Sequence, residues 1–324
     1  MEPKISVIMT AYNSSKHIGE AILSILNQTL EEFELIVVDD CSLDDTSEIV
    51  RRYADKDPRV ILLKNTVNLK PALSRNKALE IARGKYVAVL DSDDVSLPNR
   101  LREQYDYLER NQDVVLVGCA AEIIDDNGKI LGRKYYPKDF KEIKFVLLLK
   151  NPFVHSGILG RKQAMTEFGY SNDHLHSEDL KLYSNLVSKY KITNLDNILI
   201  KYRQSAGSVT LEPETRQIQL ANANKIHHDL INQYLFASPV KVKIAIETIH
   251  KMRHDLFSIL STIVFCRRLT LSYVEKEQPN IETRKTIWSI YSKEKEMLLG
   301  QIFRVHVPKL YSAAKKTYRV LSGN

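Results

Sequence analysis

The chain has 324 residues, of which 44% are hydrophobic and 27% are charged, and it carries a formal net charge of +7. This composition is ordinary for a globular protein and excludes collagen-like, disordered and disulfide-rich small scaffolds. The three cysteines, Cys41, Cys119 and Cys266, are far apart, so disulfides and zinc are not expected and a reducing cytoplasm fits.

The first hundred residues alternate short apolar runs with amphipathic stretches. The N-terminus lacks the basic region and long apolar stretch of a secretory signal. The apolar runs predict buried strands over residues 5–9, 33–38, 60–63 and 86–90. The stretches between them predict helices over residues 18–26, 42–50 and 72–82. This alternation predicts an α/β fold with a mostly parallel sheet flanked by helices.

The remainder of the chain changes character along its length. Residues 114–202 show less regular strand and helix signals, and the pattern becomes helical after about Leu211. We therefore expect one α/β domain over residues 1–210 and a basic helical region over 211–324. The helical region holds 18 Lys and Arg against 10 Asp and Glu, whereas the part before it holds 29 against 30.

The basic helical region has two competing interpretations. It is either a solvated surface or a surface for anionic lipid or an anionic partner. Nucleic acid is disfavoured because no helix-turn-helix, zinc or aromatic-basic signature accompanies the charge. The most apolar run, residues 256–265, is too short for a bilayer, which needs about 20 residues. It either packs on the catalytic domain or lies in a membrane interface, and residues 302–321 repeat the same mixture.

Phosphate-cradling glycine motifs are missing from the chain. No Gly-x-Gly-x-x-Gly follows the first strand, and no Gly-x-x-x-x-Gly-Lys-Ser/Thr occurs. A dinucleotide cofactor and a P-loop are therefore disfavoured, and a bound nucleotide would need side chains and a metal. In parallel sheets, ligands bind beyond the carboxyl ends of the strands. Here these ends carry the polar segments 10–13, 39–40 and 91–94.

Two acidic segments stand at these strand ends. Asp91, Asp93 and Asp94 repel one another unless a cation offsets them, and Mn²⁺ or Mg²⁺ takes such oxygen ligands together with substrate phosphates. The alternative is a solvated acidic turn or a helix cap. The pair Asp39 and Asp40 either caps a turn or binds a base or ribose.

These segments belong to a wider set of motifs. The chain resembles family 2 glycosyltransferases, which have the GT-A fold, over about residues 4–205. The resemblance rests on the order and spacing of residues 6–13 (Ser-Val-Ile-Met-Thr-Ala-Tyr-Asn), 25–29, 34–42, 74–78, 84–86 and 91–94, and more weakly on 177–179 and 202–203. It implies a nucleotide-sugar half over about 1–100 and an acceptor half over about 101–210.

The resemblance assigns roles to the matching residues. Those on the nucleotide side are Thr10, Ala11 and Tyr12 around the nucleoside, Asp40 at the base, Arg75, and Asp91 with Ser92. Residues 91–93 correspond to the family's Asp-x-Asp motif, with Asp93 as the direct metal ligand and Asp91 or Asp94 near the ribose or in the metal shell. Asp179 corresponds to the catalytic base, and Glu178, His155 and Arg203 are expected to support the site.

The implied chemistry is a single displacement. A divalent cation stabilises the leaving diphosphate, and a positioned carboxylate takes the proton of the attacking hydroxyl. One base opposite one leaving group predicts inversion at the anomeric carbon. His174 and His176 precede the proposed base, and a loop or surface role is favoured for them over a metal site.

The expected function is transfer of a sugar from a nucleoside-diphosphate-sugar, preferably UDP-linked, to an acceptor hydroxyl in cell-surface glycan or glycolipid biosynthesis. The acceptor is expected to be a glycan or a lipid-linked saccharide, at the cytoplasmic face of a membrane with peripheral contact. Two alternatives stay open here. One is a nucleotidyltransferase, and the other is a non-catalytic nucleotide-sugar-binding or membrane-associated interaction protein.

Overall fold

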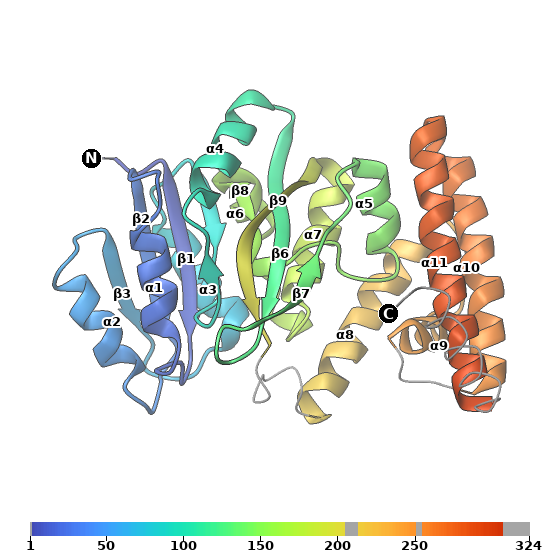
Figure 1. Ribbon diagram of the computed structural model, residues 1–324, viewed down its shortest axis with the longest axis horizontal. Coiled ribbons are helices and arrows are strands. Elements are labelled where there is room, and N and C mark those ends of the chain that lie inside the picture. The colour runs from blue at the N-terminus through green and yellow to red at the C-terminus, as the bar shows by residue number, and fades with distance from the viewer. Residues whose placement is uncertain (1, 205–212, 251–254, 307–324) are drawn as a thin grey trace, which may run out of the picture. The chain divides into compact units, whose positions relative to one another are not determined.

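The computed structural model describes residues 2–204, 213–250 and 255–306 (Figure 1). The chain divides into two compact units, one of residues 1–143 with 151–222 and one of residues 144–150 with 223–324. The expected domain boundary at 210/211 falls outside the described residues and stays a prediction. Most of the 302–321 segment lies outside them as well.

The first unit is built on one mixed sheet. Its strands follow the order β3-β2-β1-β4-β8-β6-β9-β5, with β7 paired to β6. Their bounds are β1 (Ile5–Ala11), β2 (Phe33–Asp39), β3 (Val60–Lys64), β4 (Tyr86–Val89), β5 (Val95–Ser96), β6 (Val114–Ile124), β7 (Ile130–Lys134), β8 (Leu159–Arg161) and β9 (Lys191–Arg203). Strands β1 to β4 pair in parallel, as predicted. Strands β5, β7 and β8 run antiparallel to their neighbours, so the later part of the sheet is mixed.

Helices cover this sheet in Figure 1, and the three predicted in the first hundred residues are confirmed. The helices of the first unit are α1 (Ile18–Leu26), α2 (Thr46–Ala54), α3 (Lys70–Ile81), α4 (Arg100–Arg110), α6 (Lys162–Phe168) and α7 (Glu178–Lys189), with short 3₁₀ turns η1 (His155–Gly157) and η2 (Asn172–His174). Helix α5 (Phe140–Leu147) begins in the first unit and ends in the second.

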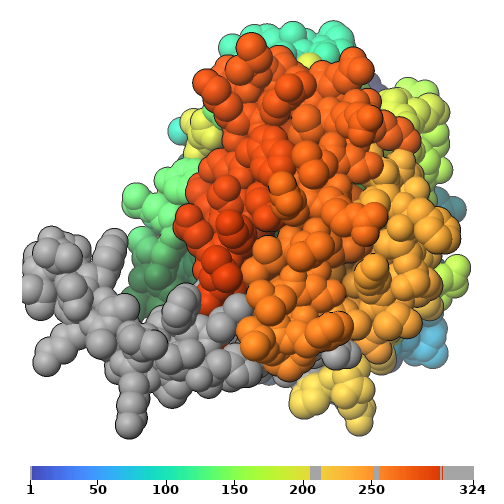
Figure 2. Space-filling model, turned by 90° about the vertical axis from the view of Figure 1, so that its right-hand side faces the viewer, coloured from blue at the N-terminus to red at the C-terminus, as the bar shows by residue number. Residues whose placement is uncertain are grey.

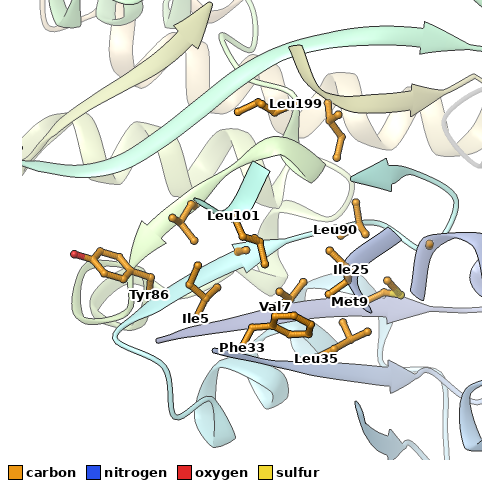
Figure 3. Packing of buried hydrophobic residues seen from close by; sticks show 14 of the residues in the cluster. Ile5, Val7, Met9, Ile25, Phe33, Leu35, Tyr86, Leu90, Leu101 and Leu199 are labelled. Atoms are coloured by element: carbon orange, nitrogen blue, oxygen red, sulfur yellow. The ribbon is translucent and has the colours of Figure 1, made fainter. Parts of the chain in front are cut away.

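The core lies between the sheet and its helices. Side chains of β1, β2, α1 and α4 meet there, among them Val7, Met9, Leu35, Ile25 and Leu101, all fully buried (Figure 3). Both faces of the central strands are covered, so nearly every residue of β1, β2 and β4 is buried. This burial fixes the carboxyl ends of the three strands beside one another.

One close backbone approach precedes β4. A Cβ on Gly84 would lie 2.5 Å from the Ser6 backbone nitrogen, closer than any side chain allows. The Gly84 N–H donates to the Ser6 hydroxyl over 2.8 Å, and that hydroxyl donates to the buried Glu34 over 2.6 Å. A glycine is therefore required where β4 joins β1.

The described part of the second unit is helical. It contains α9 (Pro239–Ile249), α10 (Leu256–Glu277), α11 (Ile281–His306) and the end of α8 (Pro213–Ile231). Figure 2 shows the orange and red surface of α10 and α11. The Asp255 carboxylate accepts a 2.8 Å bond from the Ser258 N–H and so caps α10.

Helix α10 is longer than the apolar run predicted from sequence. It has 22 residues and is long and apolar enough to cross a membrane by length and composition. The expectation that this segment is too short to span a bilayer is therefore wrong on length, because the helix continues past Phe265 as far as Glu277. Of its most apolar window, 44% is buried, and the core helix of a soluble protein can pass the same length and composition test.

Candidate active site

A cavity of about 820 Å³ opens at the carboxyl ends of β1, β2 and β4, within the first unit. Nine of the predicted site residues line it: Thr10, Ala11, Tyr12, Asp40, Arg75, Asp91, His155, Glu178 and Asp179. They come from three strand ends, from the middle of α3, from the first turn of α7 and from η1. Ser92, Asp93, Asp94 and Arg203 are not part of the lining.

Arg75 connects two sides of the cavity. Its Nη2 donates to Asp91 over 2.9 Å, and its Nη1 donates to Glu178 over 2.8 Å. Its guanidinium also lies 5.5 Å from the centre of the Tyr170 ring. Burial acts to lower the pKa of Arg75, but the charges of Asp91 and Glu178 outweigh it and raise that pKa. Two carboxylates therefore hold this cation in place.

The acidic segment contains carboxylates in unlike states. Burial acts to raise the pKa of Asp91, but the charge of Arg75 outweighs it and lowers that pKa. Burial, together with the Asp91 charge, raises the pKa of Asp93 to about 6. Burial and the charges of Asp93 and Asp91 raise the pKa of Asp94 well above its ordinary value. Asp91 is thus ionised at neutral pH, whereas burial and neighbouring charges disfavour the ionised forms of Asp93 and Asp94.

Arg203 contacts this acidic segment and is not part of the cavity lining. Its Nε donates to the Asp93 carbonyl, and its backbone N–H donates to the Asp94 carboxylate, both over 2.7 Å. Its Nη2 also donates to Glu20 over 2.6 Å. The Ser92 hydroxyl lies 2.8 Å from that of Ser14, away from the cavity lining. Arg203 therefore fixes the backbone that presents Asp93.

The acidic segment also bears on a bound metal. The described residues contain no group of three His, Cys, Asp or Glu side chains arranged around one point. Within the same residues, Asp94 Oδ2 is buried and has no hydrogen-bond partner, and Asp93 carries a charge that its surroundings destabilise. These donors fit a hard cation that takes one or two carboxylates and completes its shell with phosphate and water oxygens.

Asp179 lies in the first turn of α7, half-buried beside the cavity. Its Oδ2 accepts a 2.7 Å hydrogen bond from Asn151 Nδ2. Asn151 is itself oriented, because its Oδ1 accepts from the Phe153 N–H over 3.0 Å. Burial and the charge of Glu178 raise the pKa of Asp179 to about 6. A carboxylate with this pKa is ionised at neutral pH and is a stronger base than an ordinary aspartate.

His155 borders the cavity as a neutral side chain. Its Nδ1 lies 2.7 Å from the Tyr183 hydroxyl, and burial lowers its pKa to about 3. Its Nε2 is buried and has no partner in the described parts of the chain. His176 also lines the cavity, whereas His174 Nδ1 lies 2.9 Å from the Ser171 hydroxyl. The two histidines of the His-x-His therefore have different surroundings.

Asp40 caps the segment that begins α3. Its Oδ1 accepts 2.8 Å bonds from Asn65 and from the Leu69 N–H, and its Oδ2 accepts one from the Lys70 N–H. The capping alternative thus describes what these oxygens do, and base recognition stays a prediction. Lys70, the first residue of α3, adopts a positive φ of 69° and lines the cavity.

Several lining residues carry no motif that sequence reasoning could use. Loops and the helices α3 and α8 provide Asn151, Asn68, Lys70, Tyr136, Thr215 and Gln219. Tyr202 also lines the cavity, but it belongs to segment 202–203, which carries part of the family resemblance. Local periodicity does not report which loops meet across a sheet, so these residues required the structure.

The chain is similar to known glycosyltransferases. The model of glycosyl transferase family 2 matches residues 6–168. An uncharacterized glycosyltransferase of Methanocaldococcus jannaschii is 38% identical over 207 residues, covering 62% of this chain and 71% of the relative. The Escherichia coli UDP-Glc:alpha-D-GlcNAc-diphosphoundecaprenol beta-1,3-glucosyltransferase WfaP is 32% identical over 241 residues, covering 72% of this chain and 92% of WfaP.

Solved structures share the fold. That of Staphylococcus aureus TarS residues 1–349 in complex with UDP-GlcNAc aligns with a TM-score of 0.56 at 19% identity, covering 90% of this chain and 92% of that one. The mannosyltransferase PcManGT from Pyrobaculum calidifontis, in complex with GDP-Man and Mn²⁺, aligns with a TM-score of 0.55 at 17% identity. This alignment covers 96% of this chain and 88% of PcManGT. These likenesses show the fold alone.

Proposed function

The chain belongs to glycosyl transferase family 2 and is a glycosyltransferase, and from this premise we propose that it transfers a sugar from a nucleoside-diphosphate-sugar to an acceptor hydroxyl with inversion. The observation that carries the proposal is the placement of Asp91 and Asp179 on one cavity, joined through Arg75 and Glu178. Their pKa values are shifted in opposite directions, so one group stays a fixed anion and the other accepts a proton near neutral pH.

Asp179 acts as the general base in this proposal. The acceptor hydroxyl donates to its carboxylate and loses its proton there as the oxygen attacks the anomeric carbon. The Asn151 amide donates to one carboxylate oxygen of Asp179, and the Leu180 N–H at the start of α7 donates to the other. A single base on one side of the sugar, with the diphosphate leaving on the other, gives inversion without a covalent sugar–enzyme intermediate.

The donor side of the cavity binds the nucleoside diphosphate. Thr10, Ala11 and Tyr12 at the end of β1 line it beside Asp40 and Asp91. A bound Mn²⁺ or Mg²⁺ supplies Lewis-acid stabilisation of the leaving diphosphate, and Asp93, with Asp91 or Asp94, is the group that would hold it. PcManGT, whose structure contains Mn²⁺, supports a divalent ion. Arg75 orients Asp91, since both of its Nη atoms are engaged by carboxylates.

UDP is the preferred nucleotide of the proposal. WfaP is named for UDP-Glc, and TarS has been solved with UDP-GlcNAc, whereas PcManGT holds GDP-Man. WfaP acts on a diphosphoundecaprenol-linked sugar. A lipid-linked saccharide is accordingly the proposed acceptor class, and the cytoplasmic face of the membrane is the proposed place of action.

The test separates donor binding from transfer. Asp179→Asn removes the base but keeps the side-chain shape, so transfer is expected to fall about 10²–10⁴-fold while UDP still raises the thermal stability. Asp93→Ala is expected to abolish the metal-dependent part of that stabilisation. The control is Asp173→Asn, which changes an exposed acid in η2 near the same helix. Full transfer by Asp179→Asn, or no stabilisation of the parent by any nucleoside diphosphate with Mn²⁺, would refute the assignment.

A further inference from the structure

The second unit presents apolar side chains that nothing in the proposed active site uses. Three of them lie along α10: Phe257 is 79% exposed, Val264 59% and Leu260 47%. Their spacing of three and four residues puts them on one face of the helix. Together with Lys241, Ser261, Phe265 and Arg268 they line a groove of about 330 Å³. Exposed apolar side chains gathered in this way mark an interaction surface.

Three exposed cations lie at or next to this groove, and Asp255, which precedes Leu256, accepts from the Ser258 N–H as the cap of α10. Arg267 and Arg268 are exposed on α10, and Lys241 is exposed on α9. None of the three forms an ion pair with any residue in the described ranges. No acidic residue occurs from Leu256 to Val274, a stretch of α10 that contains both arginines. An occupant of the groove therefore meets apolar side chains flanked by unpaired cations.

We propose that this α10 surface, formed by Phe257, Leu260 and Val264 with Lys241, Arg267 and Arg268, docks the enzyme on an anionic lipid membrane. Apolar side chains of an amphipathic helix enter the boundary between headgroups and acyl chains, while cations attract the anionic headgroups. A protein partner would need acids to match these cations as well as an apolar patch. An anionic membrane leaflet provides negatively charged headgroups and an apolar interior across its whole surface.

The proposal deepens the proposed function, since it says where an enzyme with a lipid-linked acceptor would meet the membrane. It does not require α10 to span a bilayer. Its buried side, which includes Ile259, Thr262 and Leu269, packs within the protein, so only the opposite side remains for lipid. The helix would lie in the interface plane rather than cross it.

The experiment is sedimentation of the full chain with vesicles of phosphatidylcholine alone and of phosphatidylcholine mixed with phosphatidylglycerol. Binding is expected only with the anionic vesicles, and it should weaken as salt rises. Phe257→Ser is expected to weaken binding roughly tenfold or more. Arg268→Ala and Lys241→Ala should each weaken it about fivefold.

Matched controls change equally exposed residues elsewhere. Leu43→Ser alters an 85% exposed apolar side chain, and Lys56→Ala alters an exposed cation, both in the first unit. Neither should change vesicle binding. All of these side chains are exposed, so the thermal stability should stay that of the parent, and this is checked by unfolding.

Three results would overturn the proposal. The first is equal affinity of the parent and Phe257→Ser for anionic vesicles, and the second is no vesicle binding by the parent. The third is a parent dimer that Phe257→Ser dissociates with vesicle binding unchanged, which would assign the surface to a second copy. Failure of the proposed function is separate, because Asp179→Asn should bind vesicles like the parent whether or not it transfers sugar.

Discussion

The side-chain amide of Asn151 donates a 2.7 Å hydrogen bond to Asp179, across 28 positions of sequence. Asn151 lies in the loop after α5, and Asp179 lies in the first turn of α7. The bond has a fixed direction, because the other end of the amide accepts from the Phe153 N–H. Nitrogen therefore faces the carboxylate, and the bond favours its ionised form.

Asn151→Ala should raise the pKa of Asp179 above its value of about 6. The bond stabilises the anion, so its loss shifts the acid limb of kcat/KM to higher pH. The plateau should also fall about tenfold, because the carboxylate loses an orienting partner. Rates measured across pH check this. Asn172→Ala, at an exposed asparagine of η2, should leave the profile unchanged, and an unmoved limb in Asn151→Ala would contradict the prediction.

Glu178→Gln should move the same limb in the opposite direction. The charge of Glu178 raises the pKa of Asp179, so a neutral side chain lowers it and extends activity to lower pH. Glutamine keeps an oxygen that can accept from Arg75. The plateau should thus change less than the ~10²-fold expected for loss of a base. Opposite shifts for the two variants, measured in one buffer series, test whether both groups act on Asp179.

Asp93→Asn should stabilise the metal-free protein above about pH 6. Burial and the charge of Asp91 raise the pKa of Asp93 to about 6, so the folded state binds its proton more tightly than the unfolded state does. That contribution to stability is complete below the ordinary pKa of 3.8 and is lost as pH rises through about 6. A neutral amide should recover about 1–2 kcal/mol there.

Thermal unfolding with and without Mn²⁺ completes this test. Mn²⁺ should stabilise the parent more than Asp93→Asn, and the difference should grow above about pH 6, where the carboxylate is ionised. Equal stabilisation of both proteins by Mn²⁺ would remove Asp93 from the metal site.

Gly84→Ala should destabilise the fold by about 1–3 kcal/mol or more, because the new methyl group would meet the Ser6 backbone nitrogen at 2.5 Å. Backbone cannot move aside as a flexible side chain can. Gly132→Ala is the matched control, since nothing lies within 4 Å of its added Cβ. Urea unfolding should separate the two variants, and equal midpoints would show that β4 can shift away from β1.

The sequence by itself determined the strand ends and the acids placed on them. The apolar runs of β1 to β4 and the helices between them follow from local periodicity, and parallel strands bring their carboxyl ends to one edge. For this reason the amino-acid pattern alone predicts Asp40 and Asp91 at one edge of the sheet. Asp179 joins them only through the family resemblance, because it opens a helix far along the chain.

Only the tertiary structure decided what each of these side chains touches. Arg75 donates hydrogen bonds to both Asp91 and Glu178. The Ser92 hydroxyl contacts that of Ser14, and Arg203 donates to the backbone carbonyl of Asp93. Each of these contacts joins elements distant in sequence. Short-range patterns specify which face of a strand or helix is buried, but they do not specify which loops meet. The packing of elements that are distant in sequence decides which side chains become partners, and these partners shift the pKa values of the site residues.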